Sequence, residues 1–144
     1  MTRYRRVLLD TSALVAVFQP QERYHQSCVD VLRDIATPLI TSWPVLTEAH
    51  YLLRSDRNAQ KNMLSLAGSD AVLVSDIDHI FFEWYDKFVF RYDDHDVQLA
   101  DASLVWLAEQ WTTDIVFTLD QRDFSTFKIH SGTDDKPFKI LPYG

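Results

Sequence analysis

Val7-Leu8-Leu9-Asp10-Thr11-Ser12 is a short apolar run that stops at an acid followed by two hydroxyl residues. Such a run is typical of a buried strand that passes directly into a helix, because Asp, Thr and Ser all cap helices well. Residues 115–120, Ile-Val-Phe-Thr-Leu-Asp, repeat the arrangement. We therefore expect strands over 4–9 and 115–119, each followed at once by a carboxylate, Asp10 or Asp120.

The rest of the chain alternates predicted strands with predicted helices. Short apolar runs predict further strands at 38–41, 71–74 and 138–141, and helical periodicity predicts helices at 12–18, 22–35, 44–53, 58–67, 77–90 and 96–111. Pro44 suits the start of its helix, and Gly68 suits the end of another. The alternation predicts an α/β fold with a mostly parallel central sheet and helices on both faces. In such sheets, sites form beyond the carboxyl ends of the strands.

The composition predicts a single domain over residues 1–144. The chain is 47% hydrophobic, and its three glycines leave little room for flexible linkers. Its one cysteine, Cys28, allows no internal disulfide, so a cytoplasmic location is expected, and its amphipathic surroundings favour a buried structural thiol. No apolar stretch has the length of a signal sequence or a membrane span, so no membrane association is expected.

The chain is acidic, with a formal net charge of -7. This charge argues against nucleic-acid binding through bulk positive charge. It does not oppose local binding, because acids gathered in one pocket can hold divalent cations that then meet a phosphate. The placement of the acids therefore matters more than their number.

Glu48 lies on a predicted apolar face. It follows Val45 by three residues and precedes Leu52 by four, so helical spacing places it with these apolar residues rather than opposite them. An unpaired buried carboxylate costs several kcal/mol. Some compensating group is therefore expected beside Glu48.

Asp101 gives the same argument more strongly. It follows Val97 by four residues and precedes Leu104 by three, and alanines flank it on both sides. The alternatives are a neutral acid or a distant basic partner such as Arg54. For Asp10 and Asp120 the alternatives are a helix cap and a turn residue.

Two acids at strand ends and two on helices together favour a divalent-metal site. Hard cations such as Mg²⁺ prefer carboxylate and water oxygens, and a cation relieves the repulsion between like charges in a small pocket. Such a cation can activate water for attack on a phosphate. The five histidines are dispersed and no Cys/His spacing suggests zinc.

At this point the sequence resembles the PIN-domain nucleases and, within them, the VapC-type toxins of bacterial toxin–antitoxin modules. Four blocks in order carry the resemblance, at residues 7–16, 41–53, 96–105 and 118–124, and together they span most of the chain. The resemblance implies a PIN-like three-layer α/β/α fold. It also implies that Asp10, Glu48, Asp101 and Asp120 are a catalytic quartet that binds Mg²⁺ or Mn²⁺.

Further expectations come from the same resemblance. Ser12 and Thr118 would support the site through hydrogen bonds. The chain would be an endoribonuclease that leaves a 3′-hydroxyl and a 5′-phosphate, with an RNA substrate, an antitoxin partner bound to a groove in the region 51–66, and a homodimeric state. The basic residues of that region are an alternative contact for RNA phosphates.

Three alternatives to this function stay open. The first is a non-catalytic PIN-like module that binds RNA or protein, and the second is an RNA-processing nuclease without an antitoxin. The third is an aspartyl phosphotransferase of the haloacid-dehalogenase type. That class needs a second acid two residues after the first, where this chain has Ser12.

Four residues near the blocks receive separate predictions. Asp96 is expected to cap its helix, and Asp123 is expected to be a local structural acid or an outer contributor to the site. Trp111 is expected in the core, because it shares the apolar stripe of the helix at 96–111. Trp43 is the one aromatic candidate for contact with substrate.

Overall fold

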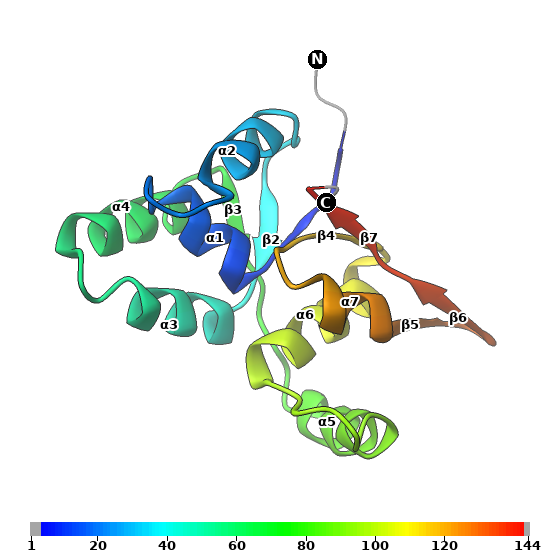
Figure 1. Cartoon of the computed structure of the whole chain (residues 1–144). Coiled ribbons are helices and arrows are strands. Elements are labelled where there is room, and N and C mark those ends of the chain that lie inside the picture. The colour runs from blue at the N-terminus through cyan, green and yellow to red at the C-terminus, as the bar shows by residue number, and fades with distance from the viewer. Residues whose placement is uncertain (1–3, 143–144) are drawn as a thin grey trace.

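A parallel sheet of five strands forms the centre of the computed structural model, which describes residues 4–142 (Figure 1). Along the sheet the strand order is β3-β2-β1-β4-β7, and every neighbouring pair is parallel. The strands are β1 (Leu8–Leu9), β2 (Leu39–Thr41), β3 (Val72–Val74), β4 (Ile115–Phe117) and β7 (Lys139–Leu141). The predicted parallel sheet is confirmed, and each of its strands lies within a predicted range.

Helices cover both sides of the sheet. Figure 1 shows α1 to α4 gathered on one side and α5 to α7 on the other, which confirms the three-layer α/β/α arrangement. The helices are α1 (Thr11–Val17), α2 (His25–Arg33), α3 (Trp43–Leu52), α4 (Arg57–Ala67), α5 (Ile80–Arg91), α6 (Leu99–Trp111) and α7 (Gln121–Thr126).

The core is centred on β1, β4 and α6. Leu8, Phe117 and Leu104 are inaccessible to solvent, and α6 is buried from Ala100 to Ala108. A helix buried on nearly all sides needs small residues as well as large ones, which explains its alanines. Cys28 is also fully buried, and this burial raises the pKa of its thiol to about 11, so the predicted structural role fits.

Two elements were missing from the prediction. Short helix α7 follows Asp120, and an antiparallel hairpin joins β5 (Lys128–Ser131) to β6 (Asp134–Pro137). Gly132 lies in the turn with a φ of 65°, a left-handed conformation that favours glycine. The hairpin is polar and β6 is exposed along its length, so it has no apolar alternation for periodicity to detect.

Two predictions at the ends of α6 were wrong. Asp96 does not cap the helix, which begins three residues later after Gln98, and its carboxylate instead accepts a hydrogen bond from the Gln98 amide at 3.0 Å. Trp111 is 37% exposed rather than in the core. Its indole N–H donates to the Ser75 hydroxyl at 3.0 Å. Ser75 directly follows β3, which is an outer strand of the sheet.

Among the described residues, no helix combines the length and the apolar character needed to cross a membrane.

Candidate metal-binding active site

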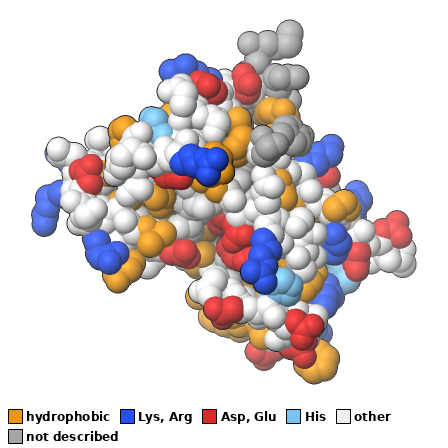
Figure 2. Space-filling model, viewed as in Figure 1, with side chains coloured by type: hydrophobic (Ala, Val, Ile, Leu, Met, Phe, Trp, Pro, Cys, Tyr) orange, Lys and Arg blue, Asp and Glu red, His pale blue; other side chains and the backbone are white. Residues whose placement is uncertain are grey.

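The pairing of β1 with β4 brings two carboxylates together. The strands are parallel, with Leu9 opposite Phe117, so Asp10 and Asp120 both leave the sheet at the same edge. The backbone N–H of Asp10 continues this pairing by donating to the Phe117 carbonyl at 3.0 Å. In Figure 2, acidic side chains gather near the middle of the visible face and basic side chains border them.

The first turn of α6 brings Asp101 to the same place. One carboxylate oxygen from each of Asp101, Asp120 and Asp123 lies within 4.8 Å of the others. A separation this short suits oxygen ligands around one cation. We call the acids Asp10, Glu48, Asp101, Asp120 and Asp123 the acid cluster.

Asp10 is the most deeply buried member, at 2% exposure. Its Oδ2 accepts a hydrogen bond from the Thr118 hydroxyl at 2.6 Å and lies 3.4 Å from the Ser12 hydroxyl. Within residues 4–142, its buried Oδ1 has no hydrogen-bond partner of ordinary geometry. Burial raises the pKa of Asp10 to about 6, and the bond from Thr118 offsets only part of this rise. The Thr11 backbone N–H also lowers the pKa of Asp10, but Oδ1 makes no hydrogen bond of ordinary geometry within residues 4–142 and can serve as a metal ligand.

Ser12 and Thr118 tie the two strand ends together. Their hydroxyl oxygens lie 3.1 Å apart. The Leu119 backbone N–H donates to Ser12 at 2.8 Å, and the Asp120 backbone N–H donates to Thr118 at 2.9 Å. This network links the Asp10 carboxylate to the segment that carries Asp120, and the supporting role of Ser12 and Thr118 in catalysis stays a prediction.

Within the acid cluster, Asp101 has a pKa raised above that of Asp10. Its side chain lies at the inner end of the site with 8% exposure, and burial together with the nearby charge of Asp10 raises its pKa to about 8. No ion pair recorded within residues 4–142 includes it. The alternative partner, Arg54, donates to the Tyr51 carbonyl at 3.1 Å and stacks over the Tyr51 ring instead.

Glu48 does not lie in the core, contrary to the prediction. The inward face of α3 consists of Val45, Leu46 and Ala49, whereas Glu48 is exposed. Its charge nevertheless raises the pKa of Asp101, so its carboxylate approaches that of Asp101 from the α3 side. It is not among the acids within 4.8 Å of one another. Glu48 is thus a rim residue of the cluster.

Asp120 has two roles at once. Its Oδ1 accepts from the Asp123 backbone N–H at 3.1 Å and so caps α7, which is close to the turn role considered as an alternative. Its carboxylate also belongs to the acid cluster. A cap uses one carboxylate oxygen and leaves the other free, so the two roles are compatible.

Asp123 lies closer to the centre than the prediction of a structural or outer acid suggested. Burial raises its pKa, and the His95 imidazole lies 3.8 Å from its Oδ1. The neighbouring Phe124 ring is fully buried and so anchors this turn of α7. The available signal was the spacing of three from Asp120, which places both acids on one side of a helical turn.

Ser42 and Ser103 were absent from the prediction. Both are fully buried, and their hydroxyls form a 2.7 Å hydrogen bond between the start of α3 and the first turns of α6. Ser103 donates to the Ala100 carbonyl at 2.6 Å, and Ser42 accepts from the Val45 backbone N–H at 3.4 Å. The pair therefore couples the Glu48 helix to the Asp101 helix.

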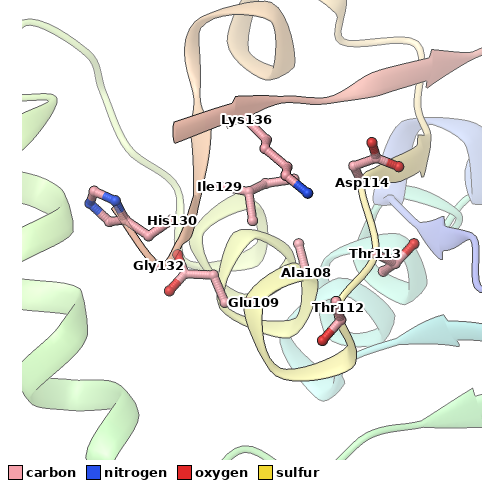
Figure 3. A pocket seen from close by; sticks show the side chains of 9 residues that line it. All are labelled: Ala108, Glu109, Thr112, Thr113, Asp114, Ile129, His130, Gly132 and Lys136. Carbon is pink, nitrogen blue, oxygen red and sulfur yellow. The ribbon is translucent and has the colours of Figure 1, made fainter. Parts of the chain in front are cut away.

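Three other cavities are lined by no member of the acid cluster, and two of them contain residues of interest. Figure 3 shows one of about 380 Å³ at the far end of α6, where Lys136 and Asp114 extend from opposite walls and Glu109 comes from the helix. The second, of about 330 Å³, is lined by Trp43 and Phe82. Trp43 is 65% exposed, and its contact with substrate stays a prediction.

The donor set of the cluster fits a hard divalent cation. Carboxylates supported by hydroxyls, without a thiol, form this set. Their negative charges lie close together, and the buried Oδ1 of Asp10 makes no hydrogen bond of ordinary geometry among the described residues. A cation would supply the missing partner and relieve the repulsion. The molecule thus belongs to the class of parallel α/β/α proteins whose site lies beyond the carboxyl ends of the strands, here with a cluster of carboxylates at that edge.

Comparison with known proteins identifies the family. The family model for the PIN domain matches residues 7–129, and the chain belongs to the PIN-domain family. It is 30% identical over 138 residues to Ribonuclease VapC26 of Mycobacterium tuberculosis, covering 94% of this chain and all of the relative.

A solved structure supports the fold. The crystal structure of Mycobacterium tuberculosis VapC20, described as a sarcin-ricin loop cleaving toxin, matches with a TM-score of 0.74 and 19% identity. The match covers 83% of this chain and 92% of the VapC20 chain. At this identity the likeness concerns the fold, which is the three-layer arrangement predicted from the sequence.

Proposed function

We propose that this protein is a divalent-metal-dependent endoribonuclease and the toxin of a toxin–antitoxin pair. The observation that carries the proposal is the acid cluster, in which Asp10 and Asp101 are buried with raised pKa values and no cationic partner among residues 4–142. The relation to Ribonuclease VapC26 supports RNA as the substrate. The cytoplasm is the proposed location, since the one cysteine is a buried free thiol.

The residues of the cluster have distinct roles in this proposal. Asp10, Asp101 and Asp120 would hold the metal together with Asp123, whose carboxylate lies within 4.8 Å of those of Asp101 and Asp120, and Glu48 would close the site from the rim. Ser12 and Thr118 keep Asp10 oriented through the hydrogen bonds described above. Mg²⁺ or Mn²⁺ supplies positive charge for the phosphate and favours ionisation of the attacking water. The products are a 3′-hydroxyl and a 5′-phosphate.

The experiment is cleavage of a structured RNA by the purified protein with Mg²⁺, with and without EDTA. Wild type is expected to cleave, and Asp101→Asn is expected to lose at least about 100-fold in rate, because it removes a charged ligand from the centre of the site. Asp70→Asn is the matched control. Asp70 is exposed and precedes β3, so it lies at the amino ends of the strands, whereas the acid cluster lies at their carboxyl ends. Equal cleavage by Asp101→Asn and wild type would refute the assignment.

Calorimetric titration with Mg²⁺ separates this proposal from a non-catalytic PIN-like module. A scaffold has no need of the metal, whereas the nuclease is expected to bind it and to lose binding in Asp101→Asn. The chain lacks the second acid that the phosphotransferase alternative requires. The hydroxyl of Ser12 occupies the position of the second acid, and it is engaged with Thr118 and Leu119.

A further inference from the structure

A cavity of about 660 Å³ lies directly beside the acid cluster. Asp120 lines it together with Tyr24, Ser27, Leu119, Gln121 and Arg122. The cavity and the candidate metal centre therefore share one wall. Its volume is within the range of about 300–1,000 Å³ that is usual for pockets that bind small molecules. Because Asp120 belongs to both, a group bound in the cavity is a neighbour of whatever the acid cluster holds.

Tyr24 offers an aromatic ring to this cavity. The ring is 45% exposed, with the Arg23 guanidinium 5.3 Å from its centroid. Its backbone, by contrast, is well held, because its carbonyl accepts hydrogen bonds from the Cys28 backbone and the Ser27 hydroxyl, both at 3.0 Å. The next residue, His25, bonds through its ring to the Ala16 carbonyl at 2.7 Å. An exposed ring on a fixed backbone is a platform for stacking.

Arg122 offers a positive charge on the other side of the cavity. It lies in the first turn of α7 and is exposed, and no ion pair or guanidinium hydrogen bond is recorded for it in the described part of the chain. Arg122 follows Asp120 by two residues and lines the same cavity, so it lies beside the acid cluster. A planar guanidinium with free donors is well suited to a phosphate. This charge matters more in a chain whose net charge is -7.

We propose that this cavity binds the unpaired nucleotide next to the scissile phosphate. The base stacks on Tyr24, and Arg122 contacts the phosphate that follows. The amide of Gln121 can donate and accept at the edge of the base. A base within a duplex is already stacked and cannot lie on a protein ring, so the cavity selects a single-stranded or looped RNA. The inference rests on the proposed ribonuclease function.

The test measures binding of a short fluorescent oligoribonucleotide without secondary structure, by anisotropy, in the Asp101→Asn protein so that no cleavage intervenes. Addition of Tyr24→Ala is expected to weaken binding roughly 5- to 100-fold, the usual effect of losing one stacked base. Tyr24→Phe keeps the ring and is expected to recover most of the affinity. Arg122→Gln is expected to weaken binding. It is also expected to reduce the slope of log binding constant against log salt concentration by about one, the value for one lost phosphate contact.

Tyr51→Ala is the matched control. Tyr51 is 60% exposed and also has an arginine over its ring, with the Arg54 guanidinium at 4.1 Å, but it does not line the cavity. This variant is expected to bind within about twofold of its parent. Equal affinities for the Tyr24→Ala and Tyr51→Ala proteins would overturn the proposal. So would an equal effect of Tyr24→Ala on the oligonucleotide and on the same strand annealed to its complement.

The cleavage measurement tests the ribonuclease proposal, and the binding measurement tests the nucleotide site separately. If wild type cleaves no RNA with Mg²⁺, the ribonuclease proposal fails whatever Tyr24 does. If wild type cleaves but Tyr24→Ala changes neither binding nor the KM for an unpaired substrate, the nucleotide site fails alone. Thermal unfolding of each variant confirms that it is folded, and the exposed rings predict little change in Tm.

Discussion

Asp10 and Asp101 are the residues whose protonation is most altered by the fold. Their pKa values of about 6 and about 8 lie above the ordinary value of 3.8, first because of burial and then because of neighbouring acids. The folded protein without metal therefore holds protons that the unfolded chain has released. These two acids oppose folding at neutral pH, and a bound cation reverses this effect.

This difference predicts how stability depends on pH. Because the folded pKa values are raised, the metal-free protein loses stability as the pH rises from about 4 through about 8, by up to about 1.4 kcal/mol per pH unit for each of the two groups while it titrates. Denaturant unfolding at several pH values measures this loss. Mg²⁺ at pH 8 is expected to restore the stability, and Asp101→Asn is expected to flatten the pH profile and abolish the response to Mg²⁺.

The control for this prediction is Asp70→Asn, which changes an exposed acid and is expected to keep the wild-type profile. Stability that rises between pH 5 and pH 8 in the metal-free wild type, relative to Asp101→Asn, would contradict the raised pKa of Asp101.

At the scale of elements, the contact between α3 and α6 determines the relative positions of Glu48 and Asp101. The buried bond between Ser42 and Ser103 lies at the start of both helices, within one turn of Asp101. Ser103→Ala leaves the Ser42 hydroxyl without an acceptor in the interior, which costs about 1–3 kcal/mol. We expect lower stability and weaker Mg²⁺ binding, measured by denaturant unfolding and calorimetry.

Ser65→Ala provides the comparison, because Ser65 lies exposed on α4. It is expected to change stability by no more than about 0.5 kcal/mol and to leave Mg²⁺ binding as in wild type. If the Ser103→Ala protein bound Mg²⁺ as tightly as the Ser65→Ala protein, the α3–α6 contact would have no part in shaping the site.

Sequence patterns predicted the sheet and the edge at which Asp10 and Asp120 meet, because buried parallel strands are nearly all apolar and end abruptly. They misplaced Glu48, since its stripe included Leu52, which is 44% exposed and does not mark the buried face. They missed α7 because it is six residues long and begins with polar residues. The proximity of Asp123 depends on that short helix, so it was undervalued too.

For the whole molecule, exposed apolar side chains are the feature that bears on partners. Tyr51 and Leu52 on α3 and Leu64 on α4 are 60%, 44% and 45% exposed. The helices α3 and α4 pack against each other, so these side chains belong to one region of the surface. Apolar surface of this kind is typical of a protein-binding region.

The toxin role predicts that a small protein encoded beside this gene binds the chain and suppresses its ribonuclease activity. Co-expression followed by size-exclusion chromatography is expected to give one co-eluting complex, and Tyr51→Ala combined with Leu64→Ala is expected to weaken it. An active ribonuclease without such a neighbouring gene would instead favour RNA processing. The same chromatography reports whether the free protein is the predicted homodimer, and limited proteolysis tests the single domain predicted over 1–144.

The parallel pairing of β1 with β4 also governs when activity can arise during synthesis. Asp10 is made first, and the strand beside it, Ile115–Phe117, and the acids Asp120 and Asp123 follow more than a hundred residues later. Contacts so distant in sequence form only after the intervening chain is complete. A nascent chain therefore carries no assembled acid cluster until the segment through Asp123 has been made and has folded against β1, so RNA cleavage cannot begin before that point.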